Sequence, residues 1–146
     1  MFKLLAVATI IFIVFNAFPS LPYNSSDVLT AINKVRIDNN LPIFKSINIL
    51  EDTALQKIDE IESTQKAEHG SNWSVKIKEK VPNYKEVGEN MAQGYDDVES
   101  LVKAWLESPL HKANILNPNY TKTGIAIKKI TLNGKEQIAV VQHFLG

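Results

Sequence analysis

The chain has no cysteine among its 146 residues. That absence excludes a disulfide-bonded scaffold, a thiolate zinc site and an enzyme with a cysteine nucleophile. An excess of charge is lacking too, because 16 basic and 16 acidic side chains cancel. A neutral chain has no long-range field for a polyanion, so we expect neither a nucleic-acid partner nor attraction to an anionic membrane. Any chemistry must therefore come from histidines, carboxylates, hydroxyls or the backbone.

An apolar run from Leu4 to Phe18 follows Lys3 near the amino terminus. As a helix, this run rises about 22 Å, which is short of the roughly 30 Å hydrocarbon core of a bilayer. The pattern predicts a secretory signal peptide over residues 1–20, cleaved between 17 and 22, and leaves an uncleaved signal anchor or a buried core helix as the alternatives. We therefore expect a secreted protein, or a membrane-tethered one if the segment is retained. Residues 23–146 are expected to form one domain that folds without disulfide bonds.

Helical spacing of apolar residues predicts helices over 28–38, 50–64 and 98–108, and a turn or short helix over 110–116. The first of these helices has three candidate N-caps, Ser25, Ser26 and Asp27, and the third has Asp96 or Asp97. From 66 to 94 the periodicity fails and glycine and proline recur. This composition predicts a long irregular stretch of the kind that is either disordered or functional.

Two strand signals close the sequence, over 124–127 and 138–144. Between them lies Asn133-Gly134, a pair that accepts the positive φ angles required at both central positions of a type I′ turn. The two segments are therefore predicted to form an antiparallel β-hairpin. Helices first and a hairpin last indicate a single α+β domain built in layers.

Three segments stand out for their residue types and order: Glu68-His69-Gly70, Gly88-Glu89-Asn90-Met91-Ala92, and the run from Ala104 to Leu116 that contains Trp105, Ser108-Pro109, His111 and Asn114-Ile115-Leu116. In this order and spacing they resemble the SCP domain of the CAP superfamily, and in particular its short, cysteine-free bacterial-type members. Asn33 and Arg36 also fit that pattern. The resemblance covers nearly all of residues 23–146, and it implies a three-layer α/β/α sandwich with an antiparallel sheet and a large central cleft.

The resemblance also implies the residues of the cleft. The family carries two histidines and two glutamates there, which hold a divalent cation in several members. His69, Glu89 and His111 match three of the four, whereas the position of the second glutamate is Ser108 here. Glu107 is adjacent, but on a helix it points about 100° away from Ser108. The implied ligand cleft is therefore formed by His69, Glu89, Ser108 and His111. Of these, His69 and His111 are the implied ligands of a cation such as zinc, with Glu89 as an optional third ligand.

Structural interpretations of the same residues remain open. His69 and His111 are also explained as structural groups whose hydrogen bonds fix loops. Glu89 is also explained as the cap of a turn or as an acceptor from backbone amides. His143 lies on a predicted strand, where a histidine with its hydrogen bonds satisfied is a simpler interpretation than a ligand. Ser108 lies three residues before His111, but no motif positions it as a nucleophile. The missing carboxylate favours a weak metal site or none.

The leading hypothesis is a secreted binding protein whose cleft receives a small or peptide-like ligand, with or without a divalent cation. A first alternative is carriage of an apolar ligand such as a sterol or fatty acid. A second is a metal-assisted hydrolase of peptides or esters that uses His69, Glu89, Ser108 and His111. A third is interaction with an envelope, wall or host surface in which the cleft takes no part. We expect a monomer.

Overall fold

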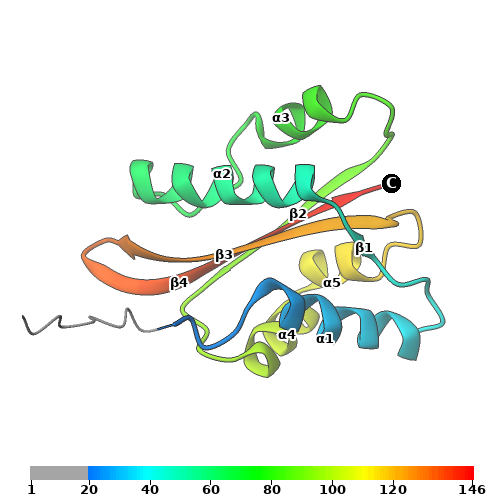
Figure 1. Cartoon of the computed structure of the whole chain (residues 1–146), viewed down its shortest axis with the longest axis horizontal. Helices are drawn as coiled ribbons and strands as arrows, with labels where there is room; N and C mark the ends of the chain where they lie inside the picture. Colours follow the sequence, from blue (N-terminus) through cyan, green and yellow to red (C-terminus); the bar gives the residue numbers. More distant parts are fainter. Residues whose placement is uncertain (1–19) are drawn as a thin grey trace, which may run out of the picture.

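The computed structural model describes residues 20–146 (Figure 1). The predicted signal peptide and the first part of its cleavage region lie outside these residues. Within the described range, no helix is both long and apolar enough to cross a bilayer. The elements follow in the order α1 (Ser25–Asp38), β1 (Lys45–Ser46), α2 (Asn48–Thr64), α3 (Trp73–Lys80), β2 (Val87–Gln93), α4 (Val98–Glu107), α5 (Pro109–Ile115), β3 (Lys122–Leu132) and β4 (Lys135–Leu145).

A four-stranded sheet in the order β1-β3-β4-β2 forms the middle layer. Helices α2 and α3 cover one face, and α1, α4 and α5 cover the other (Figure 1). The predicted α+β class and the three layers are confirmed. The pairs β2–β4 and β3–β4 are antiparallel as expected, whereas β1 adds two residues parallel to β3 and makes the sheet mixed. Two residues are too few to show the alternation by which a strand is recognised in a sequence.

The two faces of the sheet bury separate apolar clusters. Trp105, Leu101 and Ile32 belong to the cluster under α1 and α4, and the Trp105 side chain is almost completely buried there. Ile58 and Val141 belong to the cluster under α2. Because each strand alternates its side chains between the faces, one sheet serves both clusters.

The C-terminal hairpin has the predicted turn. Asn133 and Gly134 have φ angles of 51° and 76°, which are both positive as a type I′ turn requires. The turn places Leu132 opposite Lys135 and sets the register of the whole β3–β4 ladder. Both strands are longer than the apolar segments alone indicated.

The expectation of an irregular stretch over 66–94 is wrong. This segment contains α3 and β2. The apolar signal of α3 is weak because Ile77 is its only fully buried residue. In β2, the buried side chains of Glu89 and Asn90 are polar and are held by hydrogen bonds, so the strand carries no apolar alternation.

One predicted helix cap is corrected and one is confirmed. Asn24 caps α1, not Ser25, Ser26 or Asp27, because its side chain accepts hydrogen bonds from the amides of Ser26 and Asp27. Asp27 completes a capping box by accepting from the Asn24 amide. Asp97 caps α4 as expected, accepting from the Ser100 amide at 2.7 Å.

Arg36 of α1 is fully buried and ties three parts of the chain together. Its guanidinium lies 3.8 Å from the centre of the Phe44 ring. The guanidinium donates to four backbone carbonyls, those of Pro42 (2.7 Å), Ile115 (2.7 Å), Asn117 (3.0 Å) and Tyr120 (3.0 Å). It therefore fixes α1 to the segment before β1 and to the segment that joins α5 to β3.

Candidate functional site

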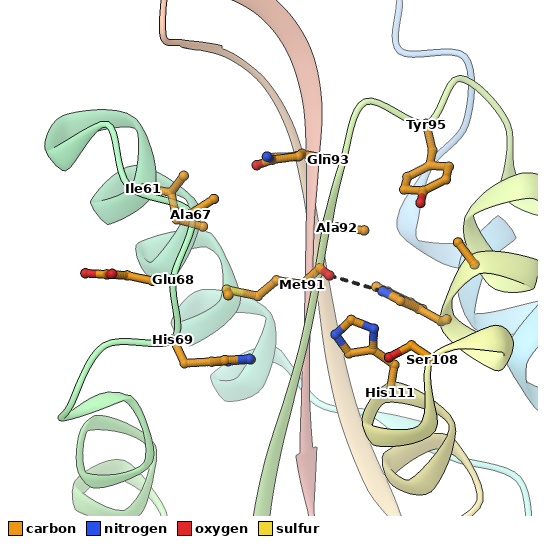
Figure 2. Close-up of a pocket in the computed structure, with 13 residues that line it drawn as sticks. Ile61, Ala67, Glu68, His69, Met91, Ala92, Gln93, Tyr95, Ser108 and His111 are labelled. Carbon is orange, nitrogen blue, oxygen red and sulfur yellow. Dashed lines mark hydrogen bonds between the residues drawn. The ribbon is translucent and has the colours of Figure 1, made fainter.

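A cleft of about 680 Å³ opens along β2, between the end of α2 on one side and α4 and α5 on the other (Figure 2). Its lining is mostly apolar or aromatic, with two histidines, a serine and a few other polar groups. The lining residues are Ile61, Ala67, Glu68, His69, Met91, Ala92, Gln93, Tyr95, Ala104, Trp105, Ser108, His111 and Ala139. The cleft contains three of the four predicted site residues, which are His69, Ser108 and His111.

His69 reaches the cleft from the loop after α2. Its ring nitrogen Nδ1 donates to Glu89 Oε1 at 2.7 Å, and its side chain is 50% exposed. The buried Lys57 of α2 holds the loop, because its ammonium donates to the His69 carbonyl (3.0 Å) and to Glu60 (3.1 Å). With Nδ1 engaged, Nε2 of His69 is left for a ligand.

Glu89 lies beneath the cleft and does not line it. Its side chain is fully buried, and its second oxygen, Oε2, accepts from Nε2 of His143 at 2.8 Å. The other nitrogen of His143, Nδ1, lies 2.8 Å from the Thr53 hydroxyl. Thr53, His143, Glu89 and His69 thus form one hydrogen-bonded chain that runs from α2 through β4 and β2 to the cleft.

The bonds of this chain orient its two imidazoles. A carboxylate only accepts, so the two imidazole nitrogens that face Glu89 are donors. The Thr53 hydroxyl has one proton and lies beside both the Leu50 carbonyl (3.0 Å) and Nδ1 of His143 (2.8 Å). The chain therefore fixes the ring orientation of His143 and, through Glu89, that of His69.

His111 enters the cleft from α5, opposite His69 (Figure 2). Its ring lies 6.4 Å from the Trp105 ring, centre to centre. Burial lowers the pKa of His111, and the neighbouring imidazole of His69 lowers that pKa further. His111 is therefore a neutral imidazole at pH 7, with a lone pair to offer to a ligand or cation.

Side-chain amides tie α5 to β2. Asn90 Nδ2 donates to the His111 carbonyl at 3.1 Å. Asn114 Nδ2 donates to Asn90 Oδ1 (2.8 Å) and to the Glu89 carbonyl (3.2 Å). The position of His111 relative to Glu89 is thus set by hydrogen bonds between β2 and α5.

The structure separates the predicted residues into two groups. His69, Ser108 and His111 share the cleft, whereas Glu89 borders a smaller cavity of about 140 Å³ between α2 and α3. Within residues 20–146, no group of three or more His, Asp or Glu residues is arranged to hold a metal ion. His143 has both ring nitrogens bonded, in agreement with the prediction of a satisfied strand histidine. Its bond to Glu89 was missed, because the partners lie 54 residues apart.

Comparison with the sequences of known proteins adds two findings. The model of the cysteine-rich secretory protein family, CAP, matches residues 29–144. YkwD of Bacillus subtilis (strain 168) is 51% identical over 43 residues, which are 30% of this chain and 17% of that protein. This chain therefore matches only a small part of that curated relative.

Solved structures show the same fold at low sequence identity. An outer surface protein of Borrelia burgdorferi has a TM-score of 0.71 and 21% identity, over 83% of this chain and 92% of that one. An extracellular protein with an SCP domain from Bacillus anthracis strain Ames has a TM-score of 0.68 and 21% identity, over 82% of this chain and 39% of that one.

Proposed function

This chain belongs to the CAP family of cysteine-rich secretory proteins, although it has no cysteine, and from that membership and its cleft we propose that it is a secreted binding protein. The cleft receives a small or peptide-like ligand between His69 and His111. One observation carries the proposal: two imidazoles face each other across a cleft of about 680 Å³, and hydrogen bonds tie each of the two segments that carry them to β2. Pre-formed, mostly apolar clefts with a few fixed polar groups are typical of ligand sites.

Two of the predicted ligands, His69 and His111, have the chemistry to bind a divalent cation such as zinc. The bond from Nδ1 of His69 to the buried Glu89 is the arrangement in which a carboxylate orients a metal-binding imidazole. His111, held neutral by burial, supplies a second nitrogen. Both Glu89 oxygens already accept from imidazoles, so we propose that Glu89 orients His69 and does not bind the cation. Bound there, the cation would act as a Lewis acid toward the ligand.

Isothermal titration calorimetry with zinc and with calcium tests the cation. We expect heat of zinc binding for the wild type and none for the variant with both His69→Ala and His111→Ala. Lys103→Ala is the control, because this exposed α4 residue does not line the cleft. Equal heats for the wild type and the double variant would remove the cation from the proposal.

Carriage of an apolar ligand is the second candidate, and the apolar lining of the cleft favours it. Ile61, Met91 and Trp105 offer no charge to a ligand and suit a sterol or fatty acid. Mass spectrometry of lipids that co-purify with the protein is the test. We expect any bound lipid to be lost when Ala104 is replaced by Trp to fill the cleft, and protein free of lipid with no sterol affinity contradicts this candidate.

Hydrolysis of peptides or esters is the enzymatic alternative. Ser108 and His111 share the cleft, but within residues 20–146 no hydrogen bond joins their side chains. Casein and ester substrates, offered with and without zinc, test this alternative, and activity unchanged in His111→Ala would exclude these residues as its source.

A further inference from the structure

The outer edge of β2 forms part of the cleft. Strand β2 is the last strand of the order β1-β3-β4-β2, so one of its edges pairs with β4 and the other does not pair with a strand. Met91, Ala92 and Gln93 of that free edge line the cleft, and Figure 2 views the edge between the two walls. The floor of the cleft is therefore backbone as well as side chains.

The hydrogen bonds identify which backbone groups face outward. Gly94 donates to the Ile138 carbonyl at 2.9 Å, so the even-numbered residues of β2 point to β4. Residues of an antiparallel strand alternate between its two edges, which leaves Glu89, Met91 and Gln93 pointing into the cleft side. Two contacts agree with this assignment, since the Glu89 carbonyl accepts from Asn114 and the Met91 carbonyl from Trp105.

Three outward groups near the mouth of the cleft have no partner within residues 20–146. They are the Met91 amide, the Gln93 amide and the Gln93 carbonyl. Gln93 is an exposed residue and Met91 is half-buried. Proteins commonly protect a free strand edge with charge, proline or a covering segment. Here Met91, Ala92 and Gln93 carry neither charge nor proline.

We propose that the cleft binds a peptide in extended conformation, which pairs with Met91 and Gln93 as a fifth strand of the sheet. This inference rests on the proposed binding function and names the class of ligand. The added strand satisfies the three free groups, and main-chain pairing of this kind supplies affinity with little dependence on sequence.

The walls of the cleft determine which side chains such a peptide carries. Met91 packs toward the cluster under α2, and Ala92 packs toward the cluster under α4. A strand paired with β2 continues this alternation, so its side chains face the two walls in turn. One wall presents Ile61, Ala67 and His69, and the other presents Trp105, Ser108 and His111. A peptide with small or medium apolar side chains and no charge fits both walls.

The test uses end-blocked heptapeptides of alternating valine and threonine, titrated into ¹⁵N-labelled protein. We expect the amides of Met91 and Gln93, which have no hydrogen-bond partner within residues 20–146, to become protected from hydrogen exchange when the peptide binds. A peptide N-methylated at the residue opposite Gln93 should bind about tenfold more weakly, because it loses a donor to the Gln93 carbonyl.

A matched pair of variants separates the backbone from the side chain. Gln93→Pro removes the amide that points into the cleft and spares the ladder to β4, whereas Gln93→Ala keeps the amide. We expect Gln93→Pro to weaken peptide binding about tenfold and Gln93→Ala to leave it within about twofold. If Gln93→Pro does not fold, the N-methylated peptide decides the question.

Each result separates this inference from the proposed function. Equal binding of the plain and N-methylated peptides, with unprotected amides, overturns strand pairing but leaves a ligand cleft. Binding of zinc or lipid with no binding of any heptapeptide overturns the peptide class alone. Absence of all three kinds of binding overturns the proposed function as well.

Discussion

Arg36 is a buried charge that holds the segment before β1 and the segment between α5 and β3 in place. Its guanidinium donates to four backbone carbonyls in the segments that flank β1 and β3, and no carboxylate within residues 20–146 pairs with it. Arg36→Met keeps most of the apolar stem and removes every donor. The four carbonyls then lose their partner in a site that is fully buried.

The expected cost follows from those bonds. Each hydrogen bond from a charged donor contributes about 1.5–3 kcal/mol net, but some water will enter the site and the ion no longer has to be desolvated. We therefore expect Arg36→Met to lower the free energy of unfolding by about 3–5 kcal/mol, against a total of about 5–15 kcal/mol for a domain. The melting temperature should fall by roughly 10–20 °C.

Urea unfolding followed by tryptophan fluorescence measures this change. Arg36→Lys keeps the charge but not the planar fork, so its loss should be intermediate. Lys34→Met is the surface control, because Lys34 is 76% exposed in its ion pair with Asp38 and should change stability by less than about 0.5 kcal/mol. A stability of Arg36→Met within about 1 kcal/mol of the wild type would refute the structural role given to these four bonds.

Three further predictions concern other contacts. Thr53→Val should cost about 1–3 kcal/mol in urea unfolding, because it removes the hydroxyl beside His143 Nδ1, whereas Thr53→Ser keeps the hydroxyl and should cost less. Gly124→Ala should destabilise the protein by about 3 kcal/mol or more, since the new Cβ would lie 2.2 Å from the Leu50 carbonyl carbon and the Glu51 nitrogen; a normal melting temperature would contradict the close approach of α2 to β3. Burial raises the pKa of Tyr23 to about 12 from 10.0, so the stability linked to its protonated phenol is present below pH 10 and is lost as the pH rises toward 12. Ultraviolet titration should find a late-titrating phenol in the wild type that is missing in Tyr23→Phe, and no difference between the two would contradict the assignment.

Local sequence signals predicted much of the secondary structure. The helical spacing of apolar residues located α1, α2 and α4, and Asn133-Gly134 located the hairpin turn. These signals act over a few residues, so they can be recognised without the fold. They failed for α3 and β2, because β2 buries Glu89 and Asn90 through partners that lie elsewhere in the chain.

The candidate site could be predicted only in part from the sequence. The ordered motifs singled out His69, Glu89, Ser108 and His111. The structure brings three of these to one cleft and places Glu89 beneath it. The roles of Thr53 and His143 had no local signal, because their contact spans 90 residues.

The sequence by itself determined the class of chemistry and the local elements. With no cysteine, it left histidines, carboxylates, hydroxyls and the backbone as the groups that can carry chemistry, and its periodicities specified most helices and the hairpin. Only the tertiary structure decided that both Glu89 oxygens are occupied and that the β2 edge opens into the cleft. The reason is physical: apolar periodicity records burial along one element, whereas hydrogen-bond partners and free strand edges depend on which elements the fold places side by side.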